Sequence, residues 1–383
     1  MPNQHAILSP SAAHRWLHCT AAPLLESEEK DEETDFALEG TLAHAYCAKK
    51  LKSLLGLSTI EEDKEINDLS GKYETGEMHE YVDTYVSIVL EHFNEIHKKT
   101  PDAKLLIEKR LDFSEVMPGS FGTSDAIIIA DMMMEVIDFK YGKGVVVSAE
   151  KNPQMMIYAV GAYDEFNFDY DIKTVKMTII QPRVDNISSY MIDAKDLVYW
   201  ALGELKSKAA EAMSGKGKQA PGDWCKFCRV KPKCKALANF CISAVENDKL
   251  IDKELMENKI LPSIDIVKSW ISTVEEYALK SALDGVKYKG YKLVEGRSNR
   301  KITDQDGCIK ALQSTYDKKL FMKPEELQTI TNIEKNIGKK PFNELCGKFI
   351  DKPAGKPTLV VESDKRKELN SAEEDFKDIN LNK

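Results

Sequence analysis

The chain has 383 residues, of which 42% are hydrophobic and 31% are charged. This composition is that of a globular protein with one or two domains, and it excludes a chain too polar to form a core. No run of eighteen apolar residues occurs, and the N-terminus lacks the basic start and apolar stretch of a signal peptide, so we expect a cytoplasmic protein with no membrane contact. The net charge of −9 excludes indiscriminate coating of nucleic acid but not a local DNA groove.

The segment before Pro101 is predicted to be helical. A Ser-Pro-Ser sequence is typical of a helix start and predicts a short helix over 9–19. Apolar residues near helical spacing predict two longer helices, over 39–54 and 77–98. The acidic run between the first two helices, 26–35, is expected to be a solvated loop.

After Pro101 short apolar segments, two of them bounded by glycine or proline, predict strands at 104–110, 122–130 and 133–140. They are followed by a predicted helix, two strands and another helix, at 152–166, 175–180, 187–192 and 196–213. Helices followed by a sheet that one helix interrupts indicate an α/β fold with a central mixed sheet flanked by helices.

The C-terminal part begins after a cysteine-rich stretch, 224–234. There we expect a helix over 264–283, a hairpin over 288–294 and short helices to about residue 349. The last, highly charged residues are expected to be disordered. We therefore divide the chain into three parts: a main domain, a mostly helical extension and a disordered tail, over 1–245, 246–355 and 356–383.

Two aspartates and a lysine occupy predicted strand ends in FGTSDAIIIADMMMEVIDFKYGKG. Asp138 and Lys140 are two apart on a strand, so their side chains project from the same face. A tight turn near Asp131 would bring Asp125 close to Asp138. Two adjacent carboxylates repel unless a cation lies between them, and Mg²⁺ or Mn²⁺ accepts such oxygen ligands. A neighbouring lysine can assist an attacking water and stabilise charge on a phosphate.

Each of these patterns also has a plainer interpretation. D-x-K alone is typical of a surface ion pair at a strand end. Gln154 and Tyr158 are four apart and share a helix face, which by itself indicates a polar face packed on the sheet. His44, in EGTLAHAY, is either a packing histidine or a nitrogen ligand. Glu108 on the first predicted strand is an additional carboxylate near the expected site, outside the primary set.

Four short motifs in one order favour a specific family. The chain resembles the RecB-type branch of the PD-(D/E)xK nuclease superfamily over about residues 9–240. The motifs that carry this resemblance are G-x-x-x-H from Gly40 to His44, G-x-x-D from Gly122 to Asp125, D-x-K from Asp138 to Lys140 and Q-x-x-x-Y from Gln154 to Tyr158. The resemblance implies a restriction-endonuclease-like fold.

The resemblance also implies roles for the motif residues. The implied metal ligands, for Mg²⁺ or Mn²⁺, are His44, Asp125 and Asp138. Lys140 would assist the attacking water, and Gln154 and Tyr158 would shape the site and its contact with DNA. The chain departs from the superfamily's name at two positions: Ser124 stands in place of the proline, and Asp138 in place of the commoner glutamate.

The spacing Cys225-x₂-Cys228-x₅-Cys234 predicts a metal or cluster site. Disulfides are disfavoured in a reducing cytosol, and three close thiolates need a cation. A closed tetrahedral set needs a fourth ligand, for which Cys19 and Cys241 are the candidates, and the spacing alone fits structural Zn²⁺. Outside this set, we expect three buried free thiols: Cys47, Cys308 and Cys346.

The chain is similar here to the iron–sulfur nucleases of the AddAB B subunit and the CRISPR-associated exonucleases. In those proteins one cysteine precedes the nuclease core, three follow it, and the four hold a [4Fe-4S] cluster. The resemblance therefore implies a cluster that clasps the two ends of the nuclease domain. Its ligands would be Cys19, Cys225, Cys228 and Cys234.

We therefore expect a metal-dependent DNA nuclease, an exonuclease, that hydrolyses phosphodiester bonds by in-line attack of water. A resemblance to an uncharacterised group of phage and prophage proteins implies a role in phage DNA recombination or processing in the host cytoplasm. DNA is the expected substrate, and a helicase or a phage recombination protein is a candidate partner. Two alternatives remain: a non-catalytic nucleic-acid-binding or recombination-accessory protein on the same fold, and a zinc-stapled interaction protein.

Overall fold

The computed structural model describes residues 6–29, 34–245, 252–296, 300–323, 326–353, 355–361 and 366–369. The chain divides into two compact units, Met1–Trp270 and Ile271–Lys383. The division falls within helix α11, Leu261–Leu283, and so lies later than the boundary after residue 245 that the sequence suggested. Among the described residues, no helix is both long enough and apolar enough to cross a membrane.

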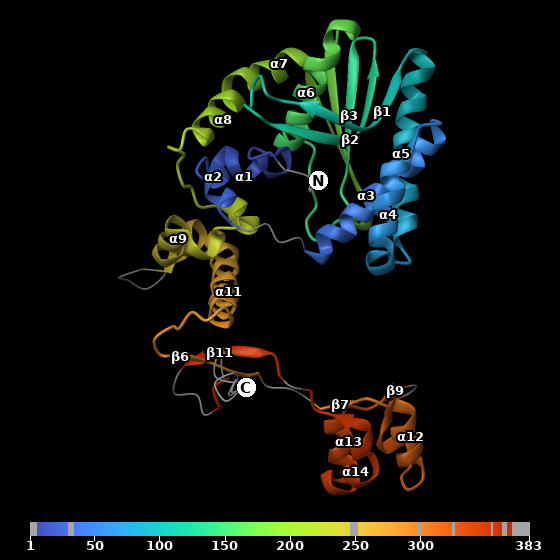
Figure 1. Cartoon of the computed structure of the whole chain (residues 1–383), viewed down its shortest axis with the longest axis vertical. Helices are drawn as coiled ribbons and strands as arrows, with labels where there is room; N and C mark the ends of the chain where they lie inside the picture. Colours follow the sequence, from blue (N-terminus) through green and yellow to red (C-terminus); the bar gives the residue numbers. More distant parts are fainter. Residues whose placement is uncertain are drawn as a thin grey trace, which may run out of the picture. The chain divides into compact units, whose positions relative to one another are not determined.

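A five-stranded sheet forms the centre of the first unit (Figure 1). Its strands lie side by side in chain order: β1 Lys104–Asp112, β2 Phe121–Ala130, β3 Met133–Phe139, β4 Thr174–Gln181 and β5 Asn186–Asp193. The pair β3–β4 is parallel and the other neighbours are antiparallel, so the predicted mixed sheet flanked by helices is confirmed. The helix between β3 and β4 makes the crossover that a parallel pair needs.

One face of the sheet is covered by α3 Asp35–Leu54 and α5 Met78–Lys99, and α4 Ile60–Tyr73 packs against α3 (Figure 1). The residues of α5 that face the sheet recur at helical spacing and include Val82, Tyr85 and Val89. They pack in one apolar cluster with sheet residues such as Ile128 and Phe139. Helix α4 was not predicted, because half of its residues are charged and few are apolar.

The opposite face carries α6, Pro153–Tyr170, with further helices around it. These are α1 Ala13–His18, α2 Ala22–Ser27, α7 Ala194–Trp200 and α8 Lys206–Met213, with a π-helical turn, Ala201–Leu205, between the last two. Gly161 lets α6 approach the end of β1, since a Cβ there would lie 2.5 Å from the ring of Phe113. Side chains alternate along β2, so Ile127 faces α6 while Ile128 faces α5.

The chain leaves α8 through short turns that carry the cysteine-rich stretch. Two 3₁₀ turns, Asp223–Phe227 and Lys231–Lys233, precede α9, Lys235–Val245. A short helix α10, Lys253–Leu255, and a π-helical turn, Met256–Ile260, then lead into α11.

The second unit has its own small core, which includes Phe321 and Phe342. Its helices beyond α11 are α12 Gln305–Gln313, α13 Ile330–Ile337 and α14 Lys339–Cys346. Three two-stranded ladders accompany them: β6 Tyr291–Glu295 with β11 Pro357–Val361, β7 Lys301–Ile302 with β10 Ile350–Asp351, and β8 Met322–Lys323 with β9 Glu326–Leu327.

The hairpin predicted over 288–294 is wrong. The strand in this region, β6, pairs antiparallel with β11, whose residues lie far along the sequence. Strand β11 falls inside the stretch expected to be a disordered tail, so that expectation is wrong for residues 357–361. Residues 362–365 and 370–383 of that stretch lie outside the described residues.

Candidate functional site

The turn between β2 and β3 sets the two aspartates opposite each other. Met132 in this turn is left-handed, with φ of 64°, and the ladder runs from Ala130 paired with Met133 to Ala126 paired with Ile137. The next pair in this register is Asp125 and Asp138. Instead of extending the ladder, the Oδ2 atom of Asp125 accepts a hydrogen bond of 2.7 Å from the backbone N–H of Phe139.

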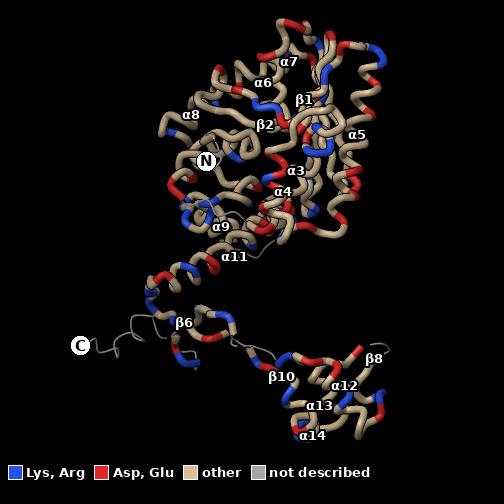
Figure 2. The backbone as a smooth tube through the Cα atoms, turned by 45° about the vertical axis from the view of Figure 1, so that its right-hand side comes forward, with Lys and Arg blue, Asp and Glu red and all other residues tan. Residues whose placement is uncertain are grey.

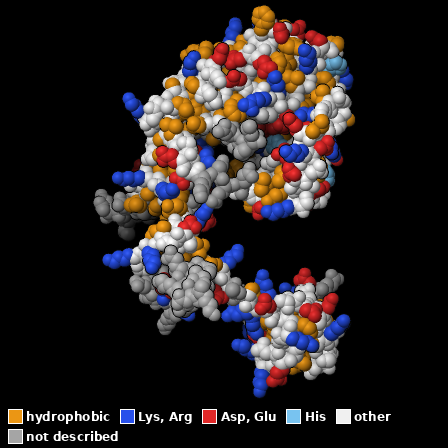
Figure 3. All heavy atoms as spheres, in the orientation of Figure 1, with side chains coloured by type: hydrophobic (Ala, Val, Ile, Leu, Met, Phe, Trp, Pro, Cys, Tyr) orange, Lys and Arg blue, Asp and Glu red, His pale blue; other side chains and the backbone are white. Residues whose placement is uncertain are grey.

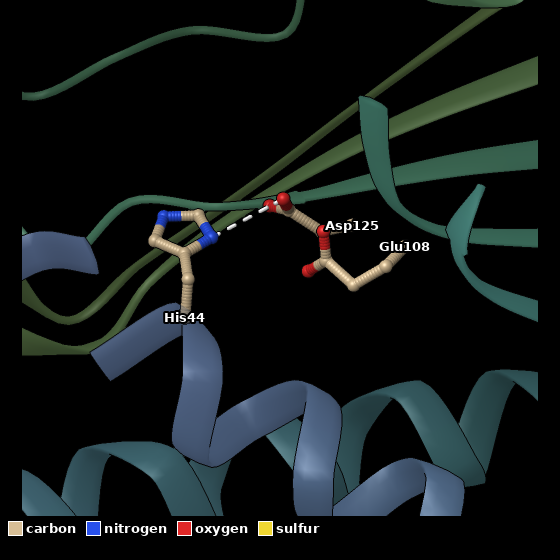
Figure 4. Close-up of side chains that lie close together, drawn as sticks. All are labelled: His44, Glu108 and Asp125. Atoms are coloured by element: carbon tan, nitrogen blue, oxygen red, sulfur yellow. Dashed lines mark hydrogen bonds and ion pairs between the residues drawn. The ribbon is translucent and has the colours of Figure 1, made fainter. Parts of the chain in front are cut away.

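A histidine and a second carboxylate converge on Asp125 (Figure 4). The Nδ1 atom of His44, on α3, donates to Oδ1 of Asp125 at 3.2 Å. Among the described residues, His44, Glu108 and Asp125 are the group whose ligand atoms all lie within 4.8 Å of one another. We call them the three-ligand group. They are candidate ligands for one metal ion.

Glu108 joins this group because the backbone of β1 is distorted at its position. Its φ is 49°, in the left-handed region, and the ladder between β1 and β2 skips the pair Glu108–Asp125. A non-glycine residue held in this region within a strand stores strain of the kind that collects at functional sites. Sequence reasoning placed Glu108 near the site but not among the ligands, since its backbone conformation left no local signal.

Without a cation, protons balance the charge of the three-ligand group. Burial alone would lower the pKa of His44, but the Asp125 carboxylate beside it raises that pKa to about 9. Burial and the negative charge of Asp125 raise the pKa of Glu108 to about 8. Near neutral pH, therefore, both groups hold protons that a divalent cation would displace. Two carboxylates and an imidazole fit Mg²⁺ or Mn²⁺.

A buried hydroxyl beside the group is a further sign of an incomplete site. Tyr85 of α5 is 1% exposed, and its hydroxyl has no hydrogen-bond partner within the described part of the chain. Burial and the neighbouring Asp125 charge raise its pKa. Such a group is normally satisfied by protein, water or an ion.

The other predicted site residues form a hydrogen-bonded set next to the three-ligand group. Asn152 caps α6, and its side-chain oxygen accepts from the backbone N–H of Gln154 at 3.0 Å, which fixes Gln154 in the first turn. The Oε1 atom of Gln154 accepts from Lys140 Nζ at 2.9 Å, while its Nε2 donates to Asp138 Oδ1 at 3.2 Å. Lys140 Nζ lies 3.0 Å from Oδ2 of Asp138.

Asp138 is thus held by Lys140 and Gln154 and stands beside the three-ligand group rather than in it. Burial raises the pKa of Asp138 although Lys140 opposes the effect. We call these six residues together the acidic site: His44, Glu108, Asp125, Asp138, Lys140 and Gln154. In Figure 3 a hollow opens on this face of the first unit, with acidic and histidine side chains along it.

Tyr158 lies one turn beyond Gln154 on α6. It is 8% exposed, and its ring packs 6.1 Å, centroid to centroid, from that of Phe113. Burial and the charge of Asp138 raise the pKa of its hydroxyl, which also contacts Gln154. Tyr158 therefore packs in the apolar cluster between α6 and the sheet, with its hydroxyl next to Gln154.

Four cysteines line one small cavity away from the acidic site, and we call them the cysteine cluster: Cys19, Cys225, Cys228 and Cys234. None of them is in a disulfide. Burial raises the pKa of Cys225 and raises that of Cys228 to about 12. Without a cation these two thiols stay protonated, whereas a bound metal would deprotonate them. Cys241, the alternative fourth ligand, is 1% exposed and packs in an apolar group with Cys225.

Hydrogen bonds hold the segment of Cys19 against the segment of the other three cysteines. Glu26 accepts from Arg15 Nε at 2.8 Å and from the backbone N–H of Arg229 at 2.9 Å. The Oγ1 atom of Thr20 accepts from the backbone N–H of Lys218 at 2.8 Å. Glu26 is only 4% exposed, so the prediction of a solvated loop is wrong at this residue.

Residues 30–33 of that predicted loop lie outside the described residues, and Asp35 begins α3.

Basic residues gather in the chain just before α9 (Figure 2). Cys47, Cys308 and Cys346 are buried free thiols, as predicted.

The fold and the two sites define a mixed α/β protein with a candidate metal centre and a separate cysteine cluster. The family described as "Protein of unknown function (DUF2800)" matches residues 5–367, and the chain belongs to this family. Among solved structures, the chain is similar to one described as "Crystal structure of SSO0001", with 14% identity over 59% of this chain and 95% of that chain, and a TM-score of 0.23. A score this low carries no argument about fold or function.

Proposed function

We propose that this protein is a Mg²⁺- or Mn²⁺-dependent DNA nuclease of the RecB-type PD-(D/E)xK class, with a restriction-endonuclease-like sheet. The observation that carries the proposal is the convergence of His44, Glu108 and Asp125 within 4.8 Å, next to the hydrogen-bonded Asp138 and Lys140. A group of ligands that would exchange its protons for a divalent cation, next to a lysine held by hydrogen bonds, suits phosphodiester hydrolysis.

The chain's own residues would share the work as follows. A divalent ion held by the three-ligand group would supply Lewis-acid chemistry for the phosphate and the attacking water. Lys140 keeps 27% of its side chain exposed, so its ammonium can meet a phosphate while Asp138 and Gln154 hold it in place. There it offsets the negative charge that develops on the phosphate and orients the attacking water. His44 would be one of the residues that hold the ion, and it would release a proton to solvent on binding it.

We propose in addition that the cysteine cluster holds a [4Fe-4S] cluster with a structural role. Support comes from the single cavity that all four cysteines line and from the roughly two hundred residues that separate Cys19 from the other three. A ligand bound by both segments would close a very long loop. Structural Zn²⁺ is the competing ligand, and metal analysis separates the two.

The biological setting of the proposal is exonucleolytic processing of phage DNA, with a helicase or a recombination protein as partner. The support for this setting is the resemblance of the sequence motifs.

The test is cleavage by anaerobically purified protein on linear and circular DNA, single- and double-stranded, with Mg²⁺, Mn²⁺ or a chelator. We expect metal-dependent loss of linear DNA, and intact circles would identify an exonuclease. Protein that contains its metals, binds DNA and cleaves none of these substrates would overturn the proposal in favour of an accessory protein.

A further inference from the structure

Arg183 follows the end of β4, next to the end of β3 where Asp138 and Lys140 of the acidic site lie. Strands β3 and β4 run parallel, with Phe139 paired to Ile180, and the backbone N–H of Lys140 donates to the carbonyl of Ile180 at 2.9 Å. The 3₁₀ turn Pro182–Val184, which contains Arg183, follows β4 directly. Lys140 and Arg183 therefore emerge from neighbouring strand ends.

Arg183 is held in a fixed orientation at this edge. Its guanidinium carbon lies 4.5 Å from the ring centroid of Tyr141 and 5.9 Å from that of Tyr81. Its Nη1 donates to Oε1 of Glu39 at 3.2 Å, and 14% of its side chain is exposed. Glu39 belongs to α3, five residues before His44. Two aromatic rings and a carboxylate thus immobilise the guanidinium beside the acidic site.

The loop that follows Lys140 is ordered from the same strand end. Gln181, the residue just before the turn, is 2% exposed. Its Nε2 donates to the carbonyls of Gly142 and Val145 at 2.6 and 2.9 Å, and its Oε1 accepts from the backbone N–H of Val147 at 3.2 Å. One buried amide therefore ties the loop to β4 and leaves Arg183 on a rigid support.

We propose that Arg183 binds a backbone phosphate of the DNA strand next to the acidic site; this rests on the proposed nuclease function. A guanidinium has five N–H donors, and within the described residues Arg183 makes one hydrogen bond, to Glu39. The remaining donors form the planar fork that matches phosphate oxygens. Because the guanidinium is already immobilised, little conformational entropy is lost when the phosphate binds.

The experiment compares the wild type with Arg183→Ala, Arg183→Lys and Arg110→Ala. Arg110 is the matched control, because its guanidinium also stacks on a ring, that of Phe121 at 4.0 Å, but from β1. Binding of a fluorescein-labelled oligothymidylate is measured by anisotropy across a salt series, with Ca²⁺ in place of Mg²⁺ to prevent cleavage. Melting temperatures of all four proteins are measured alongside.

We expect Arg183→Ala to bind about tenfold more weakly, as the loss of one charge-assisted hydrogen-bonded contact implies. The plot of the logarithm of the binding constant against the logarithm of the salt concentration should become shallower by about 0.7 in slope, the value for one phosphate contact on a single strand. Arg183→Lys should keep the slope but lose part of the affinity, since it keeps the charge and loses the fork. Arg110→Ala should change neither quantity.

Equal slopes and affinities for the Arg183→Ala and Arg110→Ala proteins would overturn the inference and leave the nuclease proposal intact. The opposite case, Arg183-dependent binding by a protein that cleaves no DNA, would keep the inference and remove the nuclease. A wild type that binds no DNA overturns both. If Arg183→Ala fails to fold, the affinity of Arg183→Lys decides, and wild-type affinity in that variant counts against the fork.

Discussion

The acidic site and the cysteine cluster lie in the same compact unit but are built in different ways. Residues of the acidic site sit on the strands or directly after one, on α3 and on the first turn of the capped helix α6. Hydrogen bonds join them, such as those of Gln154 to Lys140 and Asp138. The cysteines sit instead at the ends of short helices and turns, on two segments roughly two hundred residues apart. The sheet and the helices α3 and α6 thus position the acidic site without a ligand, whereas we expect the arrangement of the cysteine cluster to depend on what it binds.

This difference predicts opposite responses to the loss of a ligand. Removing the divalent ion from the acidic site should stop catalysis and leave the fold, because strand pairing still holds the side chains. Removing the ligand of the cysteine cluster should weaken the fold, because binding energy there is folding energy. The following predictions are ordered from the largest expected effect to the smallest.

Asp138→Ala and Lys140→Ala should each reduce the rate of DNA cleavage by about a hundred- to a thousandfold, the scale for removing one preorganised electrostatic group. Asp131→Ala is the matched control, because Asp131 is an exposed residue of the turn between β2 and β3. The melting temperature and the iron content of all three variants should stay near the wild type. Rates within a few-fold of wild type for both site variants would remove Asp138 and Lys140 from the mechanism.

Cys19→Ala should lose iron and destabilise the first unit by several kcal/mol, because the clasp closes a very long loop. The wild type purified without oxygen should be brown, with absorbance near about 400 nm. Cys308→Ala is the control, since Cys308 lies in the core of the second unit and should keep the iron. Colourless protein with one zinc per chain would favour the zinc-stapled alternative. Full iron content in Cys19→Ala would mean that the fourth ligand is another residue, with Cys241 the next candidate.

Glu108→Gln and His44→Ala should raise the Mn²⁺ concentration needed for half-maximal cleavage by roughly ten- to a hundredfold, the range for weakening a metal site. The fold should be retained in both, because neither residue carries the ladder between β2 and β3. A titration curve that does not move in Glu108→Gln would exclude Glu108 as a ligand. An unchanged curve in His44→Ala would return His44 to a packing role.

The sequence predicted the sheet well because its signals are local. Strands β2 and β3 are found within one residue of the predicted ranges 122–130 and 133–140, since glycine and turn residues bound apolar runs there. Lys140 and Asp138 share a face for the same local reason, a spacing of two. A local sequence pattern does not indicate which distant strand a segment pairs with. The segment of β6 was therefore predicted to be part of a hairpin, although its partner is β11.

The features that the sequence missed depend on distant contacts or on unusual backbone. Glu108 enters the three-ligand group through a φ of 49°, and no residue pattern signals such a value for glutamate. Glu26 is buried because Arg15 and the backbone of Arg229 provide partners from two segments. In the acidic run alone, Glu26 cannot be told from its solvated neighbours.

The smallest expected effect is a pH dependence confined to the acidic site. In the metal-free protein the pKa of His44 is raised from its ordinary 6.5 to about 9, because the attraction of Asp125 outweighs burial. A group whose pKa is raised by folding stabilises the fold fully below its unfolded pKa and loses this contribution as the pH rises through the folded value. The chelated protein should therefore lose stability between about pH 6.5 and 9.

Glu108 acts in the same direction, since its pKa is raised from 4.5 to about 8 and its contribution to stability is therefore lost between those two pH values. A bound divalent ion displaces both protons, so Mn²⁺ affinity should increase as the stability of the metal-free protein falls. The measurement is the melting temperature of chelated wild type, His44→Ala and Glu108→Gln from pH 6 to 9.5, with iron content monitored throughout. The gap between wild type and His44→Ala should close by a few degrees toward pH 9, whereas the cysteine cluster, with no part in this titration, should keep its iron. A gap that stays constant across this range would mean that His44 does not carry the proton in the folded protein, and that Asp125 is balanced by another group.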